Sequence, residues 1–262
     1  HVYDSWRMGN LRNSLTDNVQ VMARGGDDPS DMGSYSELLP GQGMVITDST
    51  ISGAATGIEL DGDTVGTITN VDVIDPSSAG LVADGYNVIT VDGLSVTDSV
   101  GTGLTNGILM MPTATGVQEF SNSNFDGVNT AISLNNDVQT TISSTTINDA
   151  TTGISTGTQS GASYTFNDVT MTAVETGILS RGTGEMTLTG SSITSTVSDI
   201  AMSGSGSVTF VDGTIDQTKV DITSTGTFFR DRSYVAAFAS RDRENSIVVI
   251  VQIVRVIEMH IG

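Results

Sequence analysis

The fold of this chain is decided by residues 163–210, SYTFNDVTMTAVETGILSRGTGEMTLTGSSITSTVSDIAMSGSGSVTF, in which one short pattern occurs three times. The triplet YTF at 164–166 is followed by MTL at 186–188 and by VTF at 208–210, at an interval of 22 residues. Each triplet alternates between inward and outward positions with the period of two that is typical of a β-strand. A fixed interval in this range indicates stacked supersecondary units that share one continuous core.

The same landmarks extend over residues 44–227 and define eight units, which mostly follow one another at intervals of 22 to 24 residues. Every unit has a first apolar anchor, a second apolar residue five positions later, and a third that usually follows glycine. The first anchors are Ile46, Ile68, Val91, Phe120, Ile142, Phe166, Leu188 and Phe210. The second anchors are Ile51, Val73, Val96, Phe125, Ile147, Met171, Ile193 and Ile215. The third anchors are Ile58, Leu81, Ile108, Ile132, Ile154, Ile178, Ile200 and Ile222.

A residue suited to a sharp bend stands two positions after each first anchor. The row is Asp48, Asn70, Gly93, Asn122, Ser144, Asp168, Gly190 and Asp212. All but one of these are Asp, Asn or Gly, which tolerate a left-handed backbone. With this bend, each unit is expected to form three short strands. The predicted fold is therefore all-β, a right-handed parallel β-helix (a three-faced β-solenoid) of about eight turns, roughly 38 Å long at about 4.8 Å per turn.

Three segments depart from the repeat. Residues 99–116 carry several extra residues, and in solenoids such insertions map to loops on one face, often the binding face. Residues 1–43 are expected to be an irregular flank or N-terminal cap, with a degenerate first turn or a linker as open alternatives. Residues 228–262 are more basic, and their apolar run 247–251 is too short for a membrane span. They are expected to form a C-terminal cap or the start of a following domain, and a truncated or misread chain end is a further alternative.

The charge distribution bears on the class of partner. The chain has 30 Asp and Glu against 10 Lys and Arg, for a net charge of −20. Between Gly25 and Phe229, 24 acidic residues are opposed only by Arg181 and Lys219. Such a surface repels phosphate backbones, so no nucleic-acid partner is expected, and anionic membranes are disfavoured. Cations, neutral glycans and proteins with basic patches are compatible partners. The simpler interpretation is that the acidic residues only keep a repetitive protein soluble.

The sequence contains no cysteine, which rules out disulfides and thiolate metal sites. It begins with His1, and no basic segment followed by an apolar one comes next, so no signal peptide is expected in this sequence. We expect an internal piece of a longer polypeptide, with no membrane insertion in this segment.

The Gly-Ile steps and the Asn or Asp bends resemble those of the right-handed parallel β-helix superfamily, the pectin-lyase-like fold. The steps are Gly57-Ile58, Gly107-Ile108, Gly153-Ile154 and Gly177-Ile178, and the resemblance covers residues 44–227. It implies the fold but leaves function open, because the superfamily includes pectate lyases, polygalacturonases, phage tailspikes, adhesins and surface proteins of no known activity. The branch that this chain resembles is the non-enzymatic or uncharacterised surface proteins.

The motifs of the enzymatic branches are missing from the repeat region. Polygalacturonase-like enzymes carry Asn-Thr-Asp, Asp-Asp, Gly-His-Gly and Arg-Ile-Lys motifs, whereas the only acidic doublet here is Asp27-Asp28, and His1 and His260 lie at the chain ends. Pectate lyases combine a calcium cluster with a basic residue that abstracts a proton, and only Arg181 and Lys219 would be available for that role. The resemblance therefore predicts no catalytic residue.

Two carboxylate pairs are the candidate metal ligands, because stacking turns equal offsets in neighbouring units into spatial neighbours. Asp61 and Asp84 stand three residues after a third anchor, with Asp63 nearby, and should lie about 5 Å apart. Asp75 and Asp98 stand seven residues after a first anchor. Close carboxylates repel unless a cation or proton lies between them, so calcium is the candidate cofactor. The same pairs would permit glycoside hydrolysis. The alternative is that they are solvated turn residues.

A row of threonines precedes the first anchors: Thr67, Thr90, Thr141, Thr165, Thr187 and Thr209, with Val45 and Glu119 as interruptions. Such a row would line one flat face, as binding to ice or another crystal requires. The strand propensity of exposed threonine explains it more simply.

These observations predict an extracellular or cell-surface module of a larger protein, structural or adhesive, with polysaccharides or other surface proteins as candidate partners. The glycan part of this prediction is carried by the resemblance alone. The alternative is a polysaccharide lyase or glycoside hydrolase of the pectin-lyase-like fold.

Overall fold

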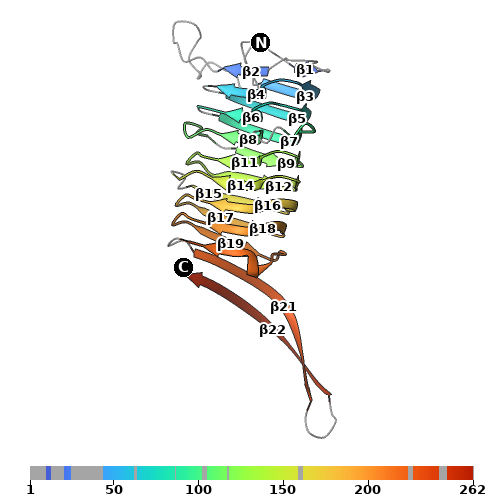
Figure 1. Ribbon diagram of the computed structural model, residues 1–262, viewed down its shortest axis with the longest axis vertical. Coiled ribbons are helices and arrows are strands. Elements are labelled where there is room, and N and C mark those ends of the chain that lie inside the picture. Colours follow the sequence, from blue (N-terminus) through green and yellow to red (C-terminus); the bar gives the residue numbers. More distant parts are fainter. Residues whose placement is uncertain are drawn as a thin grey trace.

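The computed structural model is an elongated rod of about eight stacked coils, which confirms the predicted β-solenoid (Figure 1). Each coil pairs in parallel with the coils before and after it, so the strands form one continuous sheet wound around the rod. The structure describes residues 10–12, 21–24, 44–61, 64–85, 87–101, 105–116, 118–158, 162–223, 227–241 and 247–261.

The elements follow one another along the chain as strands and one short 3-10 helix. They are β1 (Asn10–Arg12), β2 (Val21–Arg24), β3 (Met44–Ser52), β4 (Thr56–Asp61), β5 (Thr64–Ile74), β6 (Ala79–Ala83), β7 (Asn87–Thr97), β8 (Asn106–Met110), β9 (Gln118–Ser121), β10 (Asn124–Asp126), β11 (Thr130–Leu134), β12 (Thr140–Ser143), β13 (Thr146–Asn148), β14 (Thr152–Thr156), β15 (Ser163–Asn167), β16 (Thr170–Ser180), β17 (Glu185–Thr189), β18 (Ser192–Met202), β19 (Ser207–Val211), η2 (Gln217–Lys219), β20 (Val220–Ile222), β21 (Thr227–Arg241) and β22 (Ile247–Ile261).

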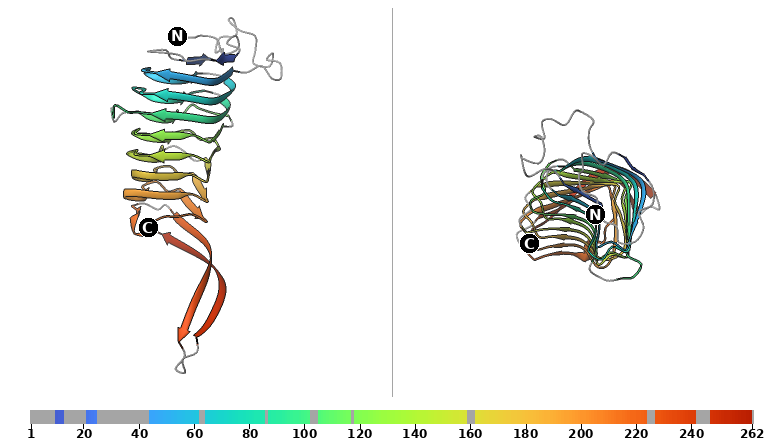
Figure 2. Two further views of the ribbon diagram at one scale, coloured as in Figure 1. Left: turned by 90° about the vertical axis from the view of Figure 1, so that its right-hand side faces the viewer. Right: turned by 90° about the horizontal axis from the view of Figure 1, so that it is seen from above.

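Three faces per coil are clearest in the middle of the rod. There β9, β10 and β11 form one coil, and each pairs in parallel with its counterpart β12, β13 or β14 in the next coil. Elsewhere the ladder continues through a bend, so that β5 and β7 each cover two faces. Seen from above, the coils superpose around a single interior (Figure 2).

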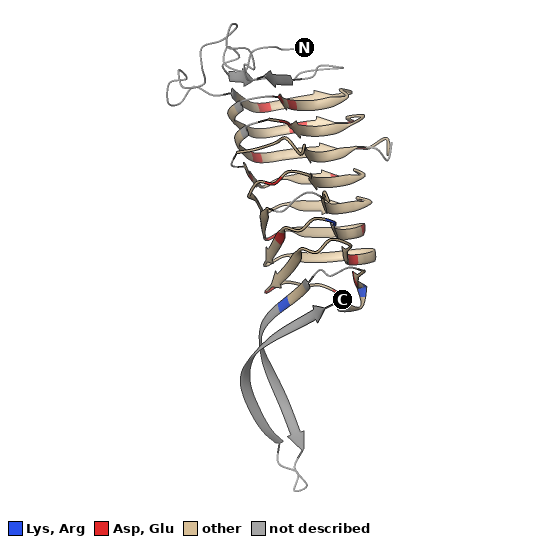
Figure 3. Cartoon of the chain, turned by 90° about the vertical axis from the view of Figure 1, so that its left-hand side faces the viewer, with Lys and Arg blue, Asp and Glu red and all other residues tan. Residues whose placement is uncertain are grey.

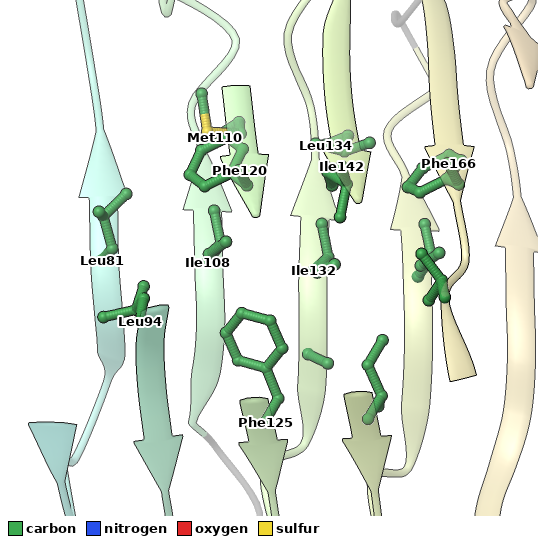
Figure 4. Packing of buried hydrophobic residues seen from close by; sticks show 14 of the residues in the cluster. Leu81, Leu94, Ile108, Met110, Phe120, Phe125, Ile132, Leu134, Ile142 and Phe166 are labelled. Atoms are coloured by element: carbon green, nitrogen blue, oxygen red, sulfur yellow. The ribbon is translucent and has the colours of Figure 1, made fainter. Parts of the chain in front are cut away.

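The three apolar landmarks of every unit line this interior. All first and second anchors are buried, as are the third anchors from Ile58 to Ile200. Only Ile222, in the last coil, is half-buried. Figure 4 shows the resulting stack, with Ile108 and Ile132 on neighbouring strands and Phe125 beside them. Burial of each such side chain stabilises the fold by about 1.5–3 kcal/mol relative to an exposed one. Every coil therefore adds a similar amount of stability to the rod.

The predicted bend between the first two strands is confirmed in all eight units. Every residue of the row has a positive φ, from 47° at Ser144 to 78° at Gly93. In four units the next residue is a buried Ser or Thr whose hydroxyl donates to the backbone carbonyl two residues earlier. These residues are Ser49, Ser123, Thr145 and Ser191. The hydroxyl therefore bonds across the bend to the backbone that precedes it. The carbonyls of Ser143 and Thr189 also accept a backbone N–H from a neighbouring coil.

A second left-handed bend follows the second strand and was not predicted. Its residues are Gly53, Asp75, Gly127, Asp149 and Ala173, with φ between 50° and 69°. The coils that contain these residues therefore have two left-handed bends each. Most residues at the second bend are again Gly or Asp.

The Gly-Ile steps, and Gly80-Leu81 in the same row, are positions of close approach between coils. A Cβ at Gly80 would lie 2.4 Å from the Cγ2 of Val96 and 2.8 Å from the backbone oxygen of Gly107. Gly57, Gly107, Gly153 and Gly177 are similarly crowded. Three residues with side chains stand in the same row, directly before a third anchor: Ala131 in the middle of the rod, and Asp199 and Asp221 near its end.

The described strands of both flanks pair with the solenoid. In segment 1–43, β1 pairs in parallel with β3 and β2 with β4, so these strands form part of an incomplete first coil. In the tail, the first five residues of β21 pair in parallel with β19, and β22 then pairs antiparallel with β21 over its whole length. The outer part of this hairpin runs beyond the last coil (Figure 1).

Candidate functional site

The first predicted carboxylate pair lies at the ends of β4 and β6. Asp61 and Asp84 each follow directly after Leu60 and Ala83, which are paired in the parallel ladder. The backbone N–H of Asp84 donates to the carbonyl of Leu60 at 2.8 Å. The predicted adjacency of these two residues along the rod is therefore confirmed. The third member proposed for this group, Asp63, lies outside the described residues.

The inserted segment reaches this pair. The hydroxyl of Thr113, within residues 99–116, donates to the carboxylate of Asp84. The backbone N–H of Thr115 also donates to the carbonyl of Gly85 at 2.7 Å. The insertion therefore packs along the edge where Asp61 and Asp84 lie and supplies a hydroxyl to one of them.

The second predicted pair is also adjacent in register but its carboxylates serve a loop. Asp75 accepts hydrogen bonds from the backbone N–H of Ser99 at 2.7 Å and from its hydroxyl at 2.8 Å. Asp98 is only 4% exposed and accepts from the backbone N–H of Gly101 at 2.9 Å and the hydroxyl of Thr105 at 3.0 Å. Both carboxylates therefore hold the start of the inserted segment.

The described residues contain no group of three or more His, Cys, Asp or Glu side chains arranged to hold a metal ion. Calcium usually takes six to eight oxygen ligands, of which a carboxylate pair supplies a fraction. Calcium binding by Asp61, Asp63, Asp84, Asp75 and Asp98 stays a prediction.

The two basic residues of the repeat region lie apart from these pairs. Arg181 is exposed and belongs to the coil of β16, four coils beyond Asp84 along the same edge. Lys219 donates to the backbone carbonyl of Ser195 at 2.6 Å near the end of the rod. Neither position suits a base that acts beside the carboxylates of Asp61 and Asp84.

The threonine row forms one outward file on the first face. The register runs without slip from Val45 through Thr67 to Thr209, with Glu119 in the position between Thr90 and Thr141. These side chains are exposed or half-buried. The file therefore offers hydroxyl groups at the spacing of the coils, about 4.8 Å.

The sequence reasoning missed a buried carboxylate in the last coils. Asp199 accepts hydrogen bonds from the backbone N–H and the hydroxyl of Ser195, and from the backbone N–H of Asp216 at 2.7 Å. Its position was visible in the sequence, because Asp199-Ile200 stands where other units have Gly-Ile. The carboxylate of Asp199 therefore connects Ser195, in the same coil, with Asp216, in the next coil.

A second carboxylate begins the short helix η2. Asp216 accepts from the hydroxyl of Thr218 at 2.7 Å and from its backbone N–H at 3.0 Å. These hydrogen bonds, the one from the hydroxyl first, hold the pKa of Asp216 below its ordinary value of 3.8. The arrangement is an N-cap, so both Asp199 and Asp216 have structural partners.

The surface of the rod is polar and acidic. Figure 3 shows Asp and Glu scattered over several coils, with few Lys or Arg. Among the described residues, the exposed large hydrophobic side chains are Ile74, Val100 and Val197, which belong to different coils. No helix in the described part of the chain is long and apolar enough to cross a membrane.

Fold and register define the chain as a member of one structural class, the parallel β-solenoids. Comparisons with known proteins found no matching family model, no matching curated protein and no matching solved structure. The likeness to the pectin-lyase-like superfamily therefore rests on the repeat pattern itself.

Proposed function

We propose that this chain is a rigid structural or adhesive module of an extracellular or cell-surface protein. The observation that carries this proposal is the continuous parallel pairing of the coils, which share one apolar core from Ile46 to Phe210. A solenoid of this kind resists bending because every coil is bonded to two neighbours over three faces. Its acidic, polar flanks suit a solvated spacer that does not adhere to itself.

Rigidity is directly testable because the chain has no cysteine. Cysteines introduced at Thr67 and Thr209, six coils apart in the outward file, would carry spin labels for pulsed electron–electron distance measurement. We expect a narrow distribution centred near the separation of six rungs, about 29 Å before the length of the labels is added. The pair Thr67 and Thr90, one rung apart, is the matched control. A broad distribution for the distant pair alone would contradict a rigid rod.

Polysaccharide contact is the finer part of the proposal. It is supported by the resemblance to the pectin-lyase-like superfamily and by a surface that favours neutral glycans over anionic polymers. The chain should be incubated with neutral and uronate-containing polysaccharides, with calcium and with chelator, while bound protein and soluble products are measured together. Binding without products is the expected result, and binding to none of the polymers would leave only the structural part of the proposal.

A polysaccharide lyase or glycoside hydrolase is the second candidate function. It is favoured by one observation, the adjacency of Asp61 and Asp84 beside the inserted segment. Paired carboxylates are the usual machinery of glycoside hydrolysis. Soluble products that disappear with Asp84→Ala, while the circular dichroism spectrum stays unchanged, would favour the enzyme over the adhesive module.

A further inference from the structure

Two side-chain amides inside the rod have no hydrogen-bond partner among the described residues. Gln118 is 1% exposed and Asn136 is 0% exposed. Among the residues that the structure describes, nothing bonds to the Nε2 and Oε1 of Gln118 or to the Nδ2 and Oδ1 of Asn136. Each amide therefore presents donors and an acceptor to the interior of the solenoid.

Both amides belong to the same interior corner, where the third strand of one coil leads into the first strand of the next. Gln118 begins β9 and is in register with Thr140 of β12, which is in register with Tyr164 of β15. The hydroxyl of Tyr164 donates to the backbone oxygen of Asn136 at 2.6 Å. Asn136 therefore lies beside the row of inward residues to which Gln118 belongs.

The polar part of this row is confined to a few coils. Ile89 precedes Gln118 in the register, and Met186 and Val208 follow Tyr164. All three of these side chains are buried and apolar. The core thus changes from apolar to polar and back within the coils next to the inserted segment, at one corner only.

Folded proteins leave few buried polar groups unsatisfied, because the group has lost its hydration and gained nothing in return. Two complete amides at one corner therefore indicate a place where a polar molecule can bind. Buried water satisfies such groups in many proteins and typically makes about three hydrogen bonds. We propose that one or more ordered water molecules occupy this corner and bind the side chains of Gln118 and Asn136. The proposal is independent of the function assigned to the rod.

A crystal structure at a resolution that shows ordered solvent tests the proposal directly. The expected result is solvent density enclosed by the coils, within about 2.7–3.2 Å of amide atoms of both Gln118 and Asn136. Two amides bonded reciprocally to each other, with no enclosed density, would overturn it.

Variants test the same idea in solution. In the double variant Gln118→Met and Asn136→Leu, apolar groups of similar shape replace both amides, so no polar group is left to hydrate. We expect the enclosed density to disappear and the melting temperature to stay the same or rise. Thr140→Val is the matched control, because the Thr140 hydroxyl already donates to the carbonyl of Val138 at 3.3 Å. That variant should lower the melting temperature and keep the water. Enclosed density that persists in the double variant would show that these amides do not bind it.

Discussion

Alanine at the Gly80-Leu81 step should destabilise the rod through one identifiable clash. Gly80 lies in β6, close to the next coil, and its backbone has no positive φ. An added Cβ would lie 2.4 Å from the Cγ2 of Val96 and 2.8 Å from the backbone oxygen of Gly107. Both distances are shorter than real Cβ contacts, so Gly80→Ala requires the next coil to shift.

The size of the effect follows from two opposing terms. Overpacking of a close-packed core costs about 1–3 kcal/mol. Alanine at a position of ordinary strand conformation gains roughly 0.4–1 kcal/mol, because it restricts the unfolded chain more than glycine does. The stiff, β-branched Val96 cannot easily rotate away, and the carbonyl of Gly107 is fixed by its ladder. Gly80→Ala should therefore lower the free energy of unfolding by about 1–2 kcal/mol.

Urea unfolding followed by circular dichroism measures this change. The matched control is Ala131→Gly, in the same row, where the native alanine is accommodated. Ala131→Gly should also lower the free energy of unfolding, by roughly 0.5–1 kcal/mol. Glycine loses more conformational entropy on folding than alanine does, and no clash is relieved at this position. In a Val96→Ala background, which removes the nearer obstacle, the cost of Gly80→Ala should shrink. A neutral Gly80→Ala, or the same cost in both backgrounds, would refute the argument from close approach.

Three further predictions concern the bends and the last coils. Ala173→Gly should raise the free energy of unfolding by about 1 kcal/mol in urea unfolding, because Ala173 has a φ of +57° that disfavours a side chain. Asp199→Ala should cost roughly 3 kcal/mol in the same assay and speed hydrogen exchange in the last coils, since the N–H groups of Ser195 and Asp216 lose their acceptor. Intact protection there would contradict that role. The stability gap between the wild type and Asp216→Ala should be full above pH 3.8 and should close as the pH falls through the lowered pKa of Asp216, where the carboxylate that binds Thr218 becomes protonated. A gap that stays constant down to that range would contradict the N-cap.

The coils were predictable because each landmark reports a local requirement that recurs at a nearly fixed interval. An apolar first anchor such as Phe166 must point inward, and Asp168 two residues later must bend the backbone. Even Ser144, which breaks the Asp, Asn or Gly pattern, adopts the left-handed conformation. There the register of the neighbouring coils overrides the preference of a single residue.

The second bend and the buried Asp199 were not predicted, for a different physical reason. The row that contains Asp75 and Ala173 stands seven residues after the first anchor in five units. Asp98 and Ser195 occupy the same offset in two other units without a positive φ, so the offset alone does not mark a bend. Asp199 takes the place of a glycine whose Cβ would elsewhere meet the following coil. Its carboxylate is accommodated because Ser195 and Asp216 donate to it, and sequence spacing alone does not reveal those partners.

The two carboxylate pairs, which have the same pattern in the sequence, differ in their hydrogen-bond partners in the structure. Each oxygen of the buried Asp98 already accepts one hydrogen bond, from Gly101 or Thr105, so a cation there would have to compete with the loop that covers it. Asp84 is half-buried at the edge of the rod, in register with Asp61. A hydroxyl such as that of Thr113 can move aside or itself become an oxygen ligand of the cation. Asp75 and Asp98 also have hydroxyl partners, but the backbone N–H groups that they bind cannot coordinate a cation and would lose their acceptor. If the rod binds calcium through either pair, the chemistry of these partners favours the edge formed by Asp61 and Asp84.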